Sequence, residues 1–195
     1  MKQHHVFSFL QRMGKSFMLP IAVLPVAGIF LGVGSSLTNE TTIMALHLSS
    51  ILGQGTFLYS VLILLKKVGN ILFDNLPLIF AVSIALGMSK RRKEVAALAA
   101  IIAFFVMHAT INALLCLDGS IVNGVVSGQV LDGSITWVCG MLSLEMGVFG
   151  GIIVGLGVSY LHNRFYQIQL PNVISFYEGE RFVTIVCAVT YVFVG

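Results

Sequence analysis

The sequence predicts an all-α integral membrane protein with about five transmembrane helices, on three observations. Of its 195 residues, 57% are hydrophobic and only 10% are charged. Its mean hydropathy is +0.96, whereas a soluble domain carries roughly 25% charged residues around its core. The few charges leave uncharged runs that match the ~20 residues a membrane-spanning helix needs. Together these features argue against a soluble enzyme, a disordered chain and a nucleic-acid-binding module.

Five runs with few or no charges are the expected spans. In chain order they lie near residues 16–37, 68–89, 95–117, 146–164 and 182–195. The last run is short for a bilayer about 30 Å thick, so we expect the sequence to stop inside a helix.

Two further segments flank these spans. Apolar residues at helical spacing predict an interfacial helix over residues 1–15, which leads into the first span. Between residues 118 and 145 no basic residue occurs, and Asn123-Gly124 and Asp132-Gly133 are typical turn formers. We expect a short loop or hairpin there, outside the membrane.

The run at residues 41–65 is ambiguous, because it also contains Thr, His, Ser and Gln. If it spans the membrane, the basic N-terminus and the cluster Lys90–Lys93 fall on opposite sides. If it lies on the outer face or re-enters from it, nine of the eleven Lys and Arg residues fall on one side. The positive-inside rule favours the second arrangement, with a cytoplasmic N-terminus.

Four polar residues within apolar runs are candidates for a substrate path. Asp74 is an ionisable group in a predicted span, and Asn75 follows it shortly before Pro77, which can break a helix. Asp74 could instead be hydrated near the outer interface, and the proline could be a harmless kink. His108 and Asn112 share a helical face, where they either bond neighbouring helices or line a solute path.

Glycines at four-residue spacing predict close helix packing or dimerisation. They are Gly28 with Gly32, and Gly147 with Gly151 and Gly155. Small residues at this spacing let helices approach closely in membranes, and the pattern is common to many membrane proteins. No metal-binding spacing occurs among the cysteines, so we expect no metal site.

Several motifs, in order along almost the whole chain, resemble those of one family. They are Gly14–Pro20 with Leu24–Gly28 and Gly32–Gly34, Asn75–Ala81 with Ala85–Gly87, Glu94–Leu98, Met107–Asn112, Met146–Ile153, Asn163–Tyr166, Leu170-Pro171, and the single residues Phe176, Gly179, Arg181, Phe182 and Val183. The chain resembles the N-terminal half of the membrane IIC component of bacterial phosphotransferase system sugar permeases, glucose/maltose type. It departs from the family's usual residues at Glu180 and Thr184.

The resemblance implies phosphoenolpyruvate-dependent uptake of a glucose- or maltose-type sugar, which is phosphorylated as it enters. The phosphoryl donor would be a partner IIB domain, so no cofactor and no catalytic residue are expected in this chain. In the family, this half forms the scaffold of a homodimer in the bacterial cell membrane. The expected partners are a second copy, IIB and IIA domains, the sugar and membrane lipid, without nucleic acid.

The sugar-binding motif of the family's second half and the IIB phosphorylation site lie outside this sequence. We therefore expect that the chain alone neither transports nor phosphorylates, although it is a component of a sugar phosphotransferase. One alternative is a non-catalytic scaffold or truncated paralogue that dimerises with full-length permeases. Another is an ion-coupled transporter that uses Asp74 and His108.

Overall fold

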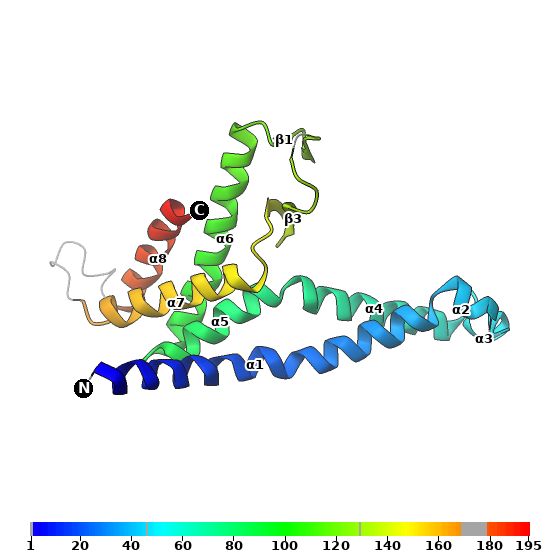
Figure 1. The fold of residues 1–195 in the computed structure, drawn as a ribbon, viewed down its shortest axis with the longest axis horizontal. Coiled ribbons are helices and arrows are strands. Elements are labelled where there is room, and N and C mark those ends of the chain that lie inside the picture. The colour runs from blue at the N-terminus through cyan, green and yellow to red at the C-terminus, as the bar shows by residue number, and fades with distance from the viewer. Residues whose placement is uncertain (1, 46, 129, 169–178) are drawn as a thin grey trace. The chain divides into compact units, whose positions relative to one another are not determined.

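The computed structural model describes residues 2–45, 47–128, 130–168 and 179–195, and it confirms the all-α membrane class. The chain forms two compact units. One comprises Met1–Met18 and Leu76–Gly195, and the other comprises Leu19–Asn75. Figure 1 shows the order of the helices and the two small hairpins.

The first helix, α1, runs without a break over Lys2–Leu37. The boundary between the expected interfacial helix at 1–15 and the expected span at 16–37 therefore lies inside one continuous helix, and the membrane placement of the two parts stays a prediction. At that boundary the Ser16 hydroxyl donates to the Arg12 carbonyl at 2.8 Å, so its polar side chain is satisfied within the helix. At about 1.5 Å per residue the 36 residues extend ~54 Å, well beyond a bilayer core.

The unit Leu19–Asn75 contains two short helices, α2 (Glu40–Ala45) and α3 (Ser49–Leu52), and then α4 (Phe57–Asp74). Thr56 is the N-cap of α4, because its hydroxyl accepts a hydrogen bond from the Tyr59 N–H at 3.2 Å. The second half of α1 packs closely on α4. A methyl group on Gly34 would lie 2.6 Å from the backbone nitrogen of Lys66. A methyl group on Gly69 would lie 2.6 Å from the backbone nitrogen of Leu31.

The stretch near 68–89, expected as one span, is not one continuous helix, and its crossing of the membrane stays a prediction. The structure breaks it at Asn75 between α4 and α5 (Leu76–Met88). Pro77 cannot donate a hydrogen bond, and its ring would clash with the carbonyl four residues earlier in a continuous helix. The Asn75 side-chain amide instead donates to the Ile71 carbonyl at 2.8 Å, which closes the end of α4.

The other unit continues with α6 (Lys93–Leu117), in agreement with the third expected span. Two antiparallel hairpins follow, β1 (Ile121–Val122) with β2 (Val125–Val126) and β3 (Ile135–Val138) with β4 (Met141–Leu144). The first turns at Asn123-Gly124 as predicted, with φ of 52° and 75°.

The remaining helices are α7 (Gly147–Phe165) and α8 (Glu180–Val194), which match the fourth and fifth expected runs. Within the described residues, α6 and the Phe7–Leu37 part of α1 are long and apolar enough to cross a bilayer. A third crossing arises if α4 and α5 form one broken span. Membrane crossing by α7 and α8 stays a prediction.

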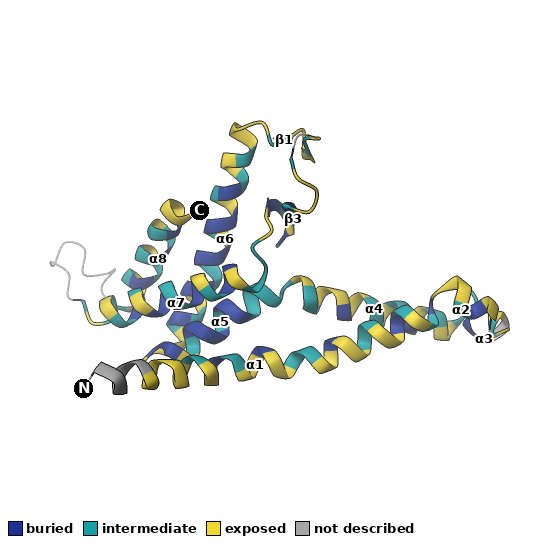
Figure 2. Ribbon diagram, viewed as in Figure 1, coloured by how far each residue is buried: buried dark blue, intermediate teal, exposed yellow. Residues whose placement is uncertain are grey.

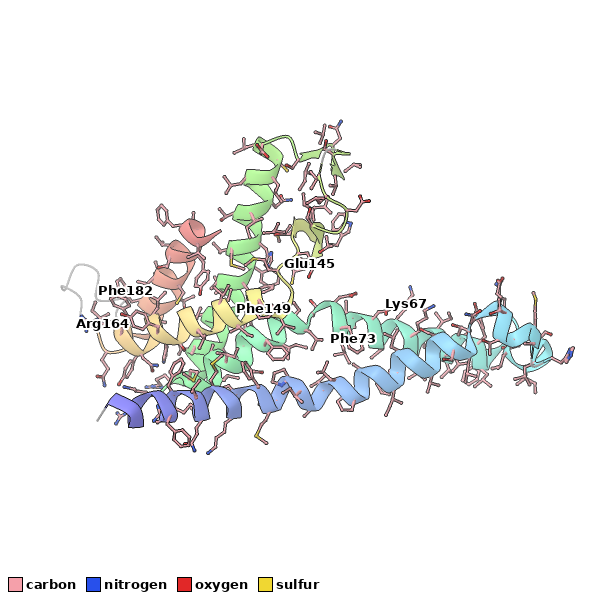
Figure 3. All side chains as sticks on the ribbon, viewed as in Figure 1. Lys67, Phe73, Glu145, Phe149, Arg164 and Phe182 are labelled. Atoms are coloured by element: carbon pink, nitrogen blue, oxygen red, sulfur yellow. The ribbon has the colours of Figure 1, made fainter. Side chains whose placement is uncertain are left out.

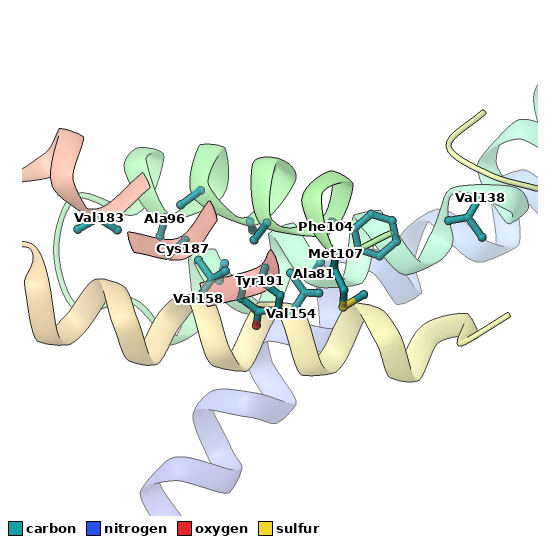
Figure 4. Packing of buried hydrophobic residues seen from close by; sticks show 14 of the residues in the cluster. Ala81, Ala96, Phe104, Met107, Val138, Val154, Val158, Val183, Cys187 and Tyr191 are labelled. Atoms are coloured by element: carbon teal, nitrogen blue, oxygen red, sulfur yellow. The ribbon is translucent and has the colours of Figure 1, made fainter. Parts of the chain in front are cut away.

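The core of this unit lies where α5, α6, α7 and α8 meet (Figure 4). Alanines dominate the α6 contribution, and Val154 of α7 and Val183 of α8 are fully buried. These small and branched side chains allow the helices to approach closely. Figure 2 shows the buried residues concentrated along α5, α6 and α7.

Candidate functional site

The four substrate-path candidates form two pairs that lie in different units. Asp74 and Asn75 end α4, where Asp74 is exposed and Asn75 is half-buried. His108 and Asn112 lie one helical turn apart on α6. The members of each pair are therefore neighbours, but the structure does not join the two pairs into one site.

The His108 and Asn112 side chains both bond strand β4. The His108 Nδ1 atom lies 2.7 Å from the Ser143 hydroxyl, and the Asn112 amide donates to the Leu142 carbonyl at 2.7 Å. His108 is 2% exposed and contacts Phe104, with ring centroids 4.5 Å apart and the ring planes tilted by 55°. These are the contacts expected if the two residues fasten neighbouring segments together.

A serine hydroxyl bonded to histidine is also the arrangement of an activated nucleophile. Here Ser143 is fully buried, so a polar substrate has no access to its hydroxyl. Among the described residues, no group of three or more His, Cys, Asp or Glu side chains is placed to hold a metal ion. The His108–Ser143 pair therefore fits a structural role.

The base of the second hairpin is closed by Glu145, which Figure 3 labels. Its carboxylate accepts from the Thr136 hydroxyl and from the Gly147 N–H, the latter at 3.1 Å. The hairpin turns at Cys139-Gly140, with φ of 49° and 86°, and burial raises the pKa of the Cys139 thiol. Sequence reasoning missed this turn because cysteine is rare in the left-handed region.

A second polar cluster, at the C-terminal end of α7, was not predicted. His162 Nε2 donates to the Arg91 carbonyl at 2.7 Å. Asn163 accepts the Lys90 N–H at 2.9 Å and donates to the Met88 carbonyl at 3.1 Å. These three bonds fix the turn that carries the basic cluster Lys90–Lys93. The adjacent His and Asn near a predicted inner helix end are the only sequence signal for this contact.

The five glycines predicted to pack helices differ in what surrounds them. A methyl group on Gly151 would collide with the Pro77 carbonyl oxygen, and one on Gly155 would lie 2.7 Å from the Ala81 oxygen. Both therefore pack α7 against α5 within one chain. Gly147 begins α7 with a φ of 51°. At Gly28 and Gly32, no described atom outside the backbone of α1 lies within 4 Å of the methyl position.

Comparison with known proteins identifies the family of this chain. The family model described as "Phosphotransferase system, EIIC" matches residues 14–195. The chain belongs to the EIIC family. EIIC is a membrane component, in agreement with the apolar helices α1 and α6.

This EIIC chain is similar to the PTS system glucose-specific EIICBA component of Staphylococcus saprophyticus subsp. saprophyticus. The two are 40% identical over 185 residues. The similarity covers 95% of this chain and 26% of that relative, so the EIIC chain spans about a quarter of the relative's length.

Proposed function

We propose that this chain is the N-terminal half of a permease that takes up a glucose-type sugar and couples its entry to phosphorylation. The observation that carries this proposal is the family match over residues 14–195, together with 40% identity to a glucose-specific EIICBA component. Maltose is the alternative sugar within the resemblance. The relative is an EIICBA component, which supports IIB and IIA domains as partners. The family resemblance implies that IIB is the phosphoryl donor.

Within that permease, the chain acts as a scaffold. The glycines of α7 let α5 approach closely, and His162 and Asn163 hold the α5–α6 turn, so this unit forms a stiff framework. Of the four substrate-path candidates, we retain Asp74 and Asn75 in that proposed role, and we assign His108 and Asn112 to the alternative role of fastening neighbouring segments, through their bonds to β4. Asp74 is the exposed member of the set.

A second copy of the chain is the proposed partner of the α1 glycines. Apart from the backbone of α1 itself, a Cβ added at Gly28 or Gly32 meets no described atom within 4 Å, so these positions have room for a substitution. We expect Gly28→Leu to lower the crosslinked dimer fraction without unfolding the protein. An unchanged dimer fraction would exclude this face as the interface.

The proposed orientation places the N-terminus in the cytoplasm, because nine of the eleven Lys and Arg residues then lie inside. Ser49 and Lys93 are both exposed, and a cysteine at each reports one side. In intact cells, Ser49→Cys should react with an impermeant maleimide, and Lys93→Cys should react only after lysis. Labelling of both from one side would contradict the orientation.

The function is tested with a chimera in which this chain replaces the matching 185 residues of the relative. In a host without its own glucose uptake, the chimera should restore uptake of labelled glucose. The same chimera with an inactive IIB domain is the control and should restore none. A chimera that is present in the membrane but inactive would contradict the proposal.

The scaffold alternative makes different predictions. A non-catalytic paralogue would crosslink to a full-length permease, and its segment would not support uptake in the chimera. Uptake by vesicles that hold this chain alone would contradict both readings.

A further inference from the structure

A cavity of about 720 Å³ opens between the N-terminal part of α1, the end of α5 with its following turn, and the C-terminal half of α7. All of its lining residues belong to the same unit. This volume lies within the 300–1,000 Å³ range of small-molecule sites. No residue of the proposed substrate path lines it, so the proposed function leaves it without a role.

Two cations lie at this cavity, Arg12 from α1 and Lys90 from the α5–α6 turn. Of the described residues that line it, none is acidic. The Lys90 backbone N–H donates a hydrogen bond to the Asn163 side chain, which fixes the point from which the Lys90 side chain extends. The carboxylate of Glu94 lies 3.9 Å from Arg92, which does not line the cavity. The cavity therefore favours an anionic ligand.

Apolar and aromatic side chains form other parts of the wall. Phe9 and Leu156 line the cavity, and Tyr160 beside them is 72% exposed. Tyrosine is enriched at the membrane–water interface, where its ring meets acyl chains and its hydroxyl meets water. The lining also comes from the end of α5 and the last turns of α7, which the proposed orientation places at the cytoplasmic face, near the lipid headgroups. A ligand here needs both a negative charge and an apolar part.

We propose that this cavity binds one anionic phospholipid, with its phosphate at Arg12 and Lys90 and its first acyl carbons along Phe9, Leu156 and Tyr160. Basic pockets between membrane helices are suited to anionic headgroups. A free phosphate would satisfy the cations but not the apolar wall. A zwitterionic lipid would fill the apolar wall but gain little from the two cations. The combination of both surfaces selects the lipid.

The test is a titration of the purified chain in neutral detergent, with bound lipid counted by native mass spectrometry. Dioleoyl-phosphatidylglycerol is the probe, and dioleoyl-phosphatidylcholine and glycerol 3-phosphate are the comparisons. The variant Arg12→Gln/Lys90→Gln removes both cations. The matched control Lys15→Gln/Lys93→Gln makes the same charge change on α1 and at the start of α6, at exposed residues outside the cavity.

We expect the cavity variant to bind phosphatidylglycerol about 30-fold more weakly, which corresponds to about 2 kcal/mol, or ~1 kcal/mol for each cation. Each single variant should lose about 5-fold, the control should bind as the unaltered chain does, and Phe9→Ala should also weaken binding. Equal elution profiles for all variants confirm that they are folded.

Equal affinity of the cavity variant and the control would overturn the proposal, as would equal binding of phosphatidylcholine. Tight binding of glycerol 3-phosphate would assign the cavity to a soluble phosphate instead. Loss of phosphoryl transfer from IIB in the chimera, with lipid binding retained, would assign the two cations to a protein interface. Because the titration is done in detergent, its outcome does not depend on the proposed transport function.

Discussion

Replacing Gly151 with alanine should weaken the packing of α7 on α5. The added methyl group would collide with the Pro77 carbonyl oxygen and lie 2.8 Å from the Pro77 carbonyl carbon. These are backbone atoms, which cannot rotate away as the end of a side chain can. The two helices must therefore move apart over the core that they share with α6 and α8 (Figure 4).

The magnitude follows from two opposing effects. Overpacking of a well-packed core costs typically 1–3 kcal/mol. Alanine is a better helix former than glycine by about 1 kcal/mol, which offsets part of this cost. Gly14 of α1 is the matched control, because no described atom outside the backbone of α1 lies within 4 Å of its methyl position. We expect Gly14→Ala to be neutral or stabilising, and Gly151→Ala to lie about 1–3 kcal/mol below it.

The buried thiol of Cys187 on α8 is a natural reporter for this measurement. It is 0% exposed, so a thiol-reactive fluorophore reaches it only after the core opens. The assay uses a background without Cys116, which is exposed, and without Cys139, which is partly buried. The labelling transition of Gly151→Ala should occur at a lower temperature than that of Gly14→Ala.

Coincident transitions for the two variants would refute the close approach of α5 and α7. A lower transition for Gly14→Ala alone would refute the assignment of open space on α1. The comparison is informative because both substitutions add one methyl group to the interior of a helix.

Three further predictions concern the polar contacts. Asn163→Ala removes two hydrogen bonds from the basic turn, so trypsin should cleave within Lys90–Lys93 faster; an unchanged rate would contradict the contact. Ser143→Ala leaves a buried histidine unpaired, and it should lower the free energy of unfolding by about 1–3 kcal/mol, measured by the same thermal assay. Burial raises the pKa of the Cys139 thiol, so less thiolate is present at neutral pH; its alkylation should be slow at pH 7 and accelerate as the pH rises.

The sequence predicted features that depend on composition and local chemistry. Uncharged runs predicted α6 and α7 closely, because long apolar segments without breakers leave little choice of structure. Asn123-Gly124 predicted the first hairpin turn, since both residues tolerate positive φ. Pro77 was recognised as a possible helix break, although the expected span ran across it.

The features that were missed depend on distant parts of the chain. The contacts of His162 and Asn163 with the α5–α6 turn join residues more than 70 positions apart, so no local pattern predicts them. The four-residue glycine spacing predicted close packing on α7 but could not identify α5 as the partner. Continuity of α1 was missed because amphipathic and apolar patterns suggested two segments where the backbone forms one.

The most direct test of the proposed function is the chemical state of the sugar taken up by the chimera with the glucose-specific relative. Cells are supplied with labelled glucose, and the label inside is separated into free and phosphorylated sugar at the earliest time points. Coupled transport predicts that the label appears as sugar phosphate from the start, and only when the IIB domain is active. Early accumulation of free glucose, or uptake that persists with an inactive IIB domain, would contradict the assignment of this chain to a phosphotransferase permease.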